Sequence, residues 1–100
     1  MNNCLTIVLP KFLEEDMVDQ LLEHPEWVSG FTTTDVSGHG RAVSYHAAAE
    51  EVRGRTTRVQ VQIVLDDVKA QALLAHLRQG FRSSEIAYWI VPVTEFGRFA

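Results

Sequence analysis

Residues 58–65 read Arg-Val-Gln-Val-Gln-Ile-Val-Leu, and an apolar side chain stands at every second position. Successive side chains of a β-strand point to opposite faces of a sheet, so these positions share one face. They are Val59, Val61, Ile63 and Leu65. The pattern predicts a strand that buries this face in a core, and it is the clearest element of the sequence.

Three other segments have the composition of strands. They are rich in apolar, β-branched or aromatic residues and cover residues 4–9, 31–37 and 86–91. The first is an almost continuous apolar run that ends at Pro10, which is typical of a strand buried on both faces. Its Cys4 is the only cysteine of the chain, so we expect a buried thiol and no intrachain disulfide.

Two segments have the apolar spacing of amphipathic helices. Residues 13–23 place their apolar side chains on one helical face and their acidic side chains off it. Pro25 should end this helix, because the residue before a proline is pushed out of the helical region. Asp66 is a good N-cap for the second helix, which should end near Gly80.

The order strand, helix, strand, strand, helix, strand predicts an α+β fold of the ferredoxin-like type, in one domain over residues 1–100. Its four-stranded antiparallel sheet would carry both helices on one face. The other face then needs cover. Aromatic residues near the C-terminus favour oligomerisation as that cover: Tyr88, Trp89, Phe96 and Phe99.

Composition limits the classes of function. Nine Lys and Arg residues against thirteen Asp and Glu give a net charge of −4, so we expect no nucleic-acid partner. The first apolar run ends too early for a signal peptide, and no stretch approaches the ~20 apolar residues of a membrane-spanning helix. We expect a cytoplasmic protein that does not insert into a membrane.

The segment between the two middle strands, residues 38–56, is the first place to look for function. A hairpin needs only two to five residues, and long loops in compact domains are usually functional or disordered. Its start, Gly38-His39-Gly40-Arg41, suits an anion, since glycine permits close approach and arginine offers a two-pronged donor. A flexible turn with a solvated arginine explains the same residues.

The same segment also contains the ligand types of a transition-metal site. Imidazole and carboxylate groups suit Zn, Ni, Co or Cu, and His46 and Glu50 have the i, i+4 spacing of a helix. With His39 they form the candidate metal set. Exposed loop histidines without a metal are the alternative, and His24 and His76 are interpreted as ordinary helix-surface residues.

The order of elements and three local strings resemble the PII superfamily of trimeric signalling proteins across nearly the whole chain. Residues 36–41, Val-Ser-Gly-His-Gly-Arg, are similar to the entry of the long PII T-loop, which contacts effectors and partners. Residues 58–64 resemble the third PII strand, and residues 89–93, Trp-Ile-Val-Pro-Val, resemble the last one. The divergent PII-like branch encoded near heavy-metal efflux transporters is the most similar, and the CutA family is a cousin.

The resemblance implies a ligand site between subunits. Its residues here are Gly38, Gly40, Arg41, Arg58, Gln62 and Arg98. It also implies a partner-contacting loop with Arg41, Tyr45 and Arg53. Three departures bear on this site: Ala42 replaces the ligand-binding glutamine, residues 83–87 lack the glycines and lysine that cradle phosphates, and Ala100 replaces the second C-terminal arginine.

Two hypotheses for the function follow from these features. In the first, the protein is a homotrimeric PII-like regulator that senses a small ligand, such as an adenine nucleotide, and controls a membrane transporter in metal homeostasis. In the second, it is a CutA-like protein that binds a divalent transition metal through the loop histidines. An enzyme is not expected, because no nucleophile with a base or paired carboxylates can be assembled from these residues.

Overall fold

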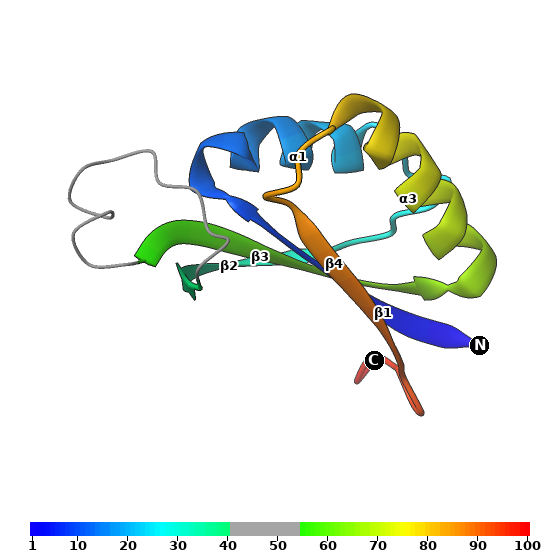
Figure 1. Cartoon of the computed structure of the whole chain (residues 1–100). Coiled ribbons are helices and arrows are strands. Elements are labelled where there is room, and N and C mark those ends of the chain that lie inside the picture. Colours follow the sequence, from blue (N-terminus) through cyan, green and yellow to red (C-terminus); the bar gives the residue numbers. More distant parts are fainter. Residues whose placement is uncertain (41–54) are drawn as a thin grey trace.

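The computed structural model describes residues 1–40 and 55–100, which form one sheet with helices over one face (Figure 1). The strands are β1 (Asn2–Pro10), β2 (Thr32–His39), β3 (Arg55–Asp66) and β4 (Ala87–Pro92). The helices are the 3-10 turn η1 (Lys11–Leu13) and the α-helices α1 (Glu14–Leu22) and α3 (Asp67–Gly80). The predicted ferredoxin-like fold is confirmed.

The sheet has the strand order β2-β3-β1-β4, and every pair of neighbours is antiparallel. The central strand β1 pairs with β3 from Asn2, opposite Asp66, to Pro10, opposite Arg58. On its other side it pairs with β4. The first and last segments of the chain are therefore joined in the sheet, and β2 and β4 are its edges.

The core lies between the sheet and the helices. The alternating strand predicted for residues 58–65 is confirmed, since Val59, Val61 and Ile63 are fully buried while Gln62 is exposed. Leu65 of β3 is also buried in the core. β1, α1, α3 and the segment after α1 supply the other core residues, which are Leu5, Ile7, Leu9, Met17, Leu21, Val28, Ala70, Leu73, Leu74 and Leu77. Burial of these side chains is the main force that holds the helices on the sheet.

The first helix is shorter than the sequence predicts. The expected range of residues 13–23 begins with η1, and α1 covers only Glu14–Leu22. Pro10 closes β1 directly before this turn, so the chain must change direction within one 3-10 turn before an α-helix can start. The acidic residues at the start of α1 suit the positive end of the helix dipole.

The second helix begins and ends where predicted. The Asp66 carboxylate accepts a hydrogen bond of 2.8 Å from the backbone N–H of Lys69, so Asp66 is the N-cap of α3. Asp67 in the first turn accepts a hydrogen bond from the Asn3 side chain, which fixes α3 to β1. In the described parts of the chain, no helix is long and apolar enough to cross a lipid bilayer.

The segment between β2 and β3 is shorter than predicted. β2 continues past the expected end at Ser37, and β3 starts three residues before the expected start at Arg58. Gly38 pairs with Thr56, and His39 pairs with Arg55. The pairing of the two strands therefore continues past the residues that the sequence pattern assigns to them. Residues 41–54 lie outside the described part of the chain.

No helix covers the second face of the sheet in the described structure (Figure 1). Cys4, predicted as buried, is half-buried here, although the neighbouring Thr6 is only 1% exposed. Near them on β4, Trp89 and Val91 are 47% and 45% exposed. The expectation that β1 is buried on both faces therefore holds for Thr6 and fails for Cys4. We call Cys4, Thr6, Val64, Trp89 and Val91 the open face of the sheet.

Candidate functional site

Arg58 is the buried cation of the candidate ligand site. Its side chain is 7% exposed, and Nη1 donates a hydrogen bond of 2.8 Å to the carbonyl oxygen of Glu85. Arg58 stands opposite Pro10 at one end of the sheet, so this contact joins β3 to the connection between α3 and β4. A buried charge needs such partners, because removal from water destabilises it otherwise.

The two glycines lie at the same end of the sheet. Gly38 pairs with Thr56, two positions along β3 from Arg58, which corresponds to about 7 Å along the strand. Gly40 follows β2 and has a φ of 153°, a backbone conformation that residues with a side chain rarely adopt. Of the predicted ligand-binding residues, the structure thus brings Gly38, Gly40 and Arg58 to one end of the sheet.

Gln62 is not part of this group. It shares a face with Arg58 because both have even numbers in the same strand, but four residues separate them, which is about 13 Å. Gln62 stands between Thr6 of β1 and Thr32 of β2 and is exposed. A single small ligand group therefore does not contact both side chains.

Arg98 lies near the opposite end of the sheet. The tail follows β4, and the N–H of Val93 donates a hydrogen bond of 3.0 Å to the carbonyl of Asn2. Phe96 then shares a shallow hollow with Asn2 and Asp66. The nine residues of β1 separate this end from Arg58 by about 27 Å. Within one chain, the structure does not bring Arg98 to the other ligand residues.

The connection between α3 and β4 corresponds to the phosphate-binding segment of the PII resemblance, and two of its backbone amides are already used. The N–H of Glu85 donates to the Ser83 hydroxyl at 3.1 Å, and the N–H of Ile86 donates to the Ser83 carbonyl at 3.3 Å. A glycine-rich loop offers such amides to a phosphate. Here they close a turn, which agrees with the missing glycines of residues 83–87.

A second cation at this end of the sheet is held by carboxylates. The Lys11 ammonium lies 2.6 Å from Asp35 and 2.7 Å from Glu14. Its hydrogen bonds, first to Asp35 and then to Glu14, raise the pKa of Lys11 above its usual value. Lys11 and Asp35 are exposed and Glu14 is only partly buried, so the contribution of both pairs to stability is small. The pair with Asp35 links η1 to β2, and the pair with Glu14 links η1 to the first residue of α1.

The candidate metal residues are not assembled by the described structure. His39 is exposed at the end of β2, and His46 and Glu50 lie outside the described residues. The loop residues Arg41, Tyr45 and Arg53 also lie outside them. Across residues 1–40 and 55–100, no group of three or more His, Cys, Asp or Glu side chains is arranged to hold a metal ion.

Comparison with known families decides the relationship of the chain. The family model DUF3240, described as a protein of unknown function, matches residues 1–100. The chain belongs to the DUF3240 family. A crystal structure of a DUF3240 protein from Shewanella baltica OS155 is 23% identical, with a TM-score of 0.80 over 99% of this chain and 97% of that one. Among curated protein sequences, none matches this DUF3240 chain significantly.

Two PII-like structures share the fold of this DUF3240 protein. The nitrogen regulatory PII-like protein CPII from Thiomonas intermedia K12 is 18% identical, with a TM-score of 0.72 over 97% of this chain and 93% of that one. That protein is bound to ADP, AMP and bicarbonate. A PII-like signalling protein from Thermus thermophilus is 17% identical, with a TM-score of 0.62 over 89% of this chain and 83% of that one. The fold of this DUF3240 protein is therefore PII-like.

One polar cluster of this DUF3240 protein was not predicted. The His24 ring stacks on Trp27 with ring centroids 4.9 Å apart and meets the edge of His76 at 4.2 Å. His24 Nδ1 lies 2.8 Å from a Glu26 carboxylate oxygen, and His76 Nε2 lies 3.1 Å from the Gln20 amide oxygen. These contacts fasten the end of α1 to α3, so neither histidine is an isolated helix-surface residue.

Proposed function

We propose that this protein is a PII-like regulator that binds a small ligand and changes the state of a partner protein. The observation that carries the proposal is the buried Arg58 guanidinium, which contacts the α3–β4 connection at the end of the sheet where Gly38 and Gly40 lie. A ligand bound beside Arg58 would touch both ends of the β2–β3 segment. In other proteins, a ligand that orders a loop changes how that loop contacts a partner protein, and in this way binding controls the partner.

The ligand that we propose is an adenine nucleotide. The fold shared with CPII, which is bound to ADP, AMP and bicarbonate, supports this class. The occupied amides of residues 85 and 86 argue against a phosphate cradle made by the backbone, so arginine side chains would provide the phosphate contacts. The protein would bind the nucleotide without converting it.

The assembly that we propose is a homotrimer with the ligand between subunits. Arg58 and Arg98 of one chain lie at opposite ends of the sheet, so only a second copy can bring Arg98 to Arg58. The open face supplies apolar area for such an assembly. The partner that the PII resemblance supports is a membrane transporter in metal homeostasis, contacted from the cytoplasm by the β2–β3 segment.

Thermal unfolding with ADP, AMP, ATP and bicarbonate tests this proposal. A ligand at one hundred times its Kd should stabilise the native protein by about 2.7 kcal/mol, and recovered nucleotide should be unchanged. Arg98→Gln should weaken the nucleotide effect without changing the stability of the free protein, because Arg98 is exposed. Lys69→Gln, which removes another exposed cation, is the matched control.

Two results would contradict the proposal. One is the absence of any stabilisation by nucleotide or bicarbonate. The other is an Arg98→Gln variant that binds nucleotide as tightly as the unchanged protein does. Zn, Ni, Co and Cu ions in the same experiment test the alternative that the loop histidines bind a metal.

A further inference from the structure

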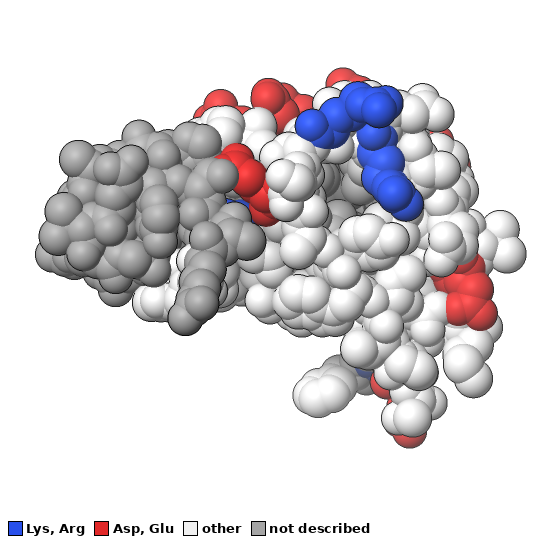
Figure 2. All heavy atoms as spheres, viewed as in Figure 1, with Lys and Arg blue, Asp and Glu red and all other residues white. Residues whose placement is uncertain are grey.

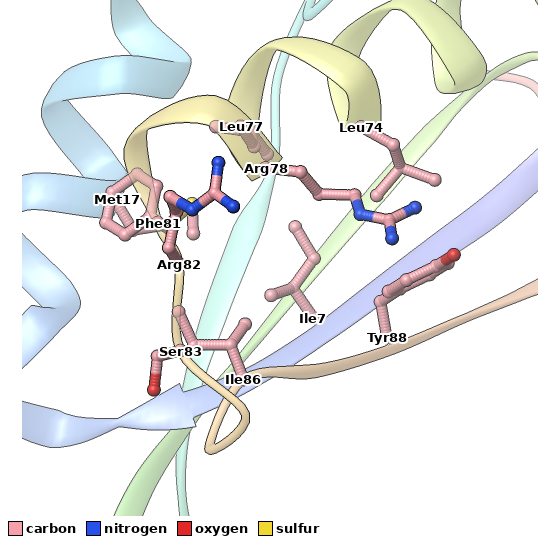
Figure 3. A pocket seen from close by; sticks show the side chains of 10 residues that line it. All are labelled: Ile7, Met17, Leu74, Leu77, Arg78, Phe81, Arg82, Ser83, Ile86 and Tyr88. Carbon is pink, nitrogen blue, oxygen red and sulfur yellow. The ribbon is translucent and has the colours of Figure 1, made fainter.

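A hollow of about 620 Å³ lies under the C-terminal end of α3, on the helix side of the sheet. Its walls come from α3, from the connection that follows this helix, and from the start of β4, while Ile7 of β1 forms part of the floor (Figure 3). Pockets for small molecules commonly have this size, with an apolar lining and a few polar groups. The hollow has both features.

The floor of the hollow is apolar and rigid. Ile7, Leu74 and Leu77 are each no more than 6% exposed and belong to the main core, and Met17 of α1 closes one side. Side chains that are fixed by core packing keep their positions when a ligand arrives. A ligand resting above this floor would therefore bind at little cost in protein order.

The rim of the hollow is cationic. Arg78 and Arg82 are exposed on α3 and on the connection after it, and Figure 3 shows the Arg78 guanidinium reaching over the hollow toward the side of the Tyr88 hydroxyl. Within the described residues, neither arginine forms an ion pair. Figure 2 shows Lys and Arg atoms gathered over this part of the molecule.

We infer that this hollow binds a small amphipathic carboxylate, a molecule with one apolar ring system or short chain and one anionic head. The apolar part would lie against Phe81, Ile86 and the Tyr88 ring, above the buried floor, and the carboxylate would accept one hydrogen bond from Arg78 and one from Arg82. Arginine suits a carboxylate because its planar guanidinium can donate two parallel hydrogen bonds. The Tyr88 hydroxyl offers one more donor at the rim.

The hollow and the site around Arg58 share the α3–β4 connection, since Ser83 and Ile86 line the hollow and Glu85 contacts Arg58, but the two sites differ in the face of the sheet that they use. Arg58 alternates with the core residue Val59, so its side chain leaves β3 on the face away from the helices, whereas the hollow opens on the helix side. The chain's own tail leaves at the other end of the sheet, where Val93 bonds to Asn2. This tail therefore does not fill the hollow, and competition with ADP tests whether the proposed nucleotide does.

Methyl NMR of the full chain with two matched probes tests the inference. The probes are 2-naphthoate and 2-naphthylmethanol, which share the ring system and differ in the anionic head. With thirteen non-hydrogen atoms at about 0.3 kcal/mol each, naphthoate should bind with a Kd of about 1 mM or tighter. We expect its addition to shift the methyl signals of Ile7, Leu74, Leu77 and Ile86.

Variants identify the groups that recognise the head. Loss of one charge-assisted hydrogen bond should weaken naphthoate binding about tenfold in each of Arg78→Gln and Arg82→Gln. The alcohol should bind equally to the unchanged protein and to both variants. Tyr88→Phe removes only a hydroxyl, so it tests that donor without opening a cavity. Arg98→Gln should leave both probes unaffected.

Three results would overturn the inference. The first is equal binding of the two probes. The second is a set of shifted methyl signals that belong to Val64 and Val91 of the open face. The third is displacement of naphthoate by saturating ADP. The third result would place the hollow inside the nucleotide site. A protein that binds naphthoate and ignores ADP would support this inference while contradicting the proposed nucleotide ligand.

Discussion

Asp66 shows how one side chain sets the boundary of an element. Its carboxylate accepts the hydrogen bond from the Lys69 N–H, one of the four amides that have no partner within the first turn of α3. We predict that Asp66→Ala destabilises the protein by about 1 kcal/mol. Chemical denaturation measures the change. Asp66→Asn retains an N-cap oxygen and should keep most of the stability, so an equal loss in both variants would contradict the assignment.

The Glu26 carboxyl gives a second prediction for a single residue, which concerns the dependence of stability on pH. Its hydrogen bond with His24, followed by one with its own backbone, lowers the pKa of the Glu26 carboxyl below 4.5. Because the folded pKa is lowered, the carboxylate stabilises the fold above pH 4.5, and this contribution is lost as the pH falls through the folded value. NMR titration of the carboxyl carbon measures the midpoint.

His24→Phe is the matched variant for this titration. Phenylalanine keeps a ring to stack on Trp27 and removes the nitrogen that contacts Glu26. The Glu26 pKa should therefore rise toward its usual value in the variant. An unchanged midpoint would show that His24 is not the main cause of the lowered pKa.

At the scale of one element, α3 is held to the sheet by one of its faces. Leu73 is fully buried in the core, whereas Val68 of the same helix is 80% exposed. We predict that Leu73→Ala destabilises the protein by about 2–5 kcal/mol, through lost apolar burial and the cavity that remains. Val68→Ala should change stability by less than about 0.5 kcal/mol, because surface substitutions in helices have small effects.

Thermal or urea unfolding of the two variants compares them directly. A Val68→Ala effect as large as that of Leu73→Ala would mean that the outer face of α3 is covered in solution. A small effect of Leu73→Ala would contradict its place in the core.

The elements differ in how far local sequence determined them. The alternation of residues 58–65 and the Asp66 cap use only neighbouring residues, and both predictions are confirmed. The predicted end of β2 at Ser37 was wrong, because Gly38 and His39 have no strand preference of their own. Their pairing with Thr56 and Arg55 depends on a partner strand, which no local pattern records.

The candidate site shows the same limit more strongly. Glycines and arginines near the middle strands could be marked from spacing and from the PII resemblance, but the contact of Arg58 with Glu85 joins separate elements. His76 and Gln20 are 56 positions apart and meet only through helix packing. The hollow under α3 combines β1, α1, α3 and β4, so no single motif could indicate it.

For the whole molecule, the open face predicts a change of mass. If the proposed trimer covers Trp89, its mass in sedimentation should be three times the 11.3 kDa of the chain, and Trp89→Lys should shift the population to monomers. Val68→Lys places the same charge on an exposed position of α3 and should leave the assembly intact. A monomeric unchanged protein, or a trimeric Trp89→Lys variant, would contradict the assembly.

The central position of β1 has a consequence for synthesis on the ribosome. β1 is translated first, yet its two neighbours in the sheet are β3 and β4, which are translated later. At roughly 5–20 residues per second, the apolar side chains of β1 wait several seconds for β4. The nascent chain therefore exposes an apolar strand while the elements between β1 and β4 are being made, and its sheet can close only after β4 has been translated.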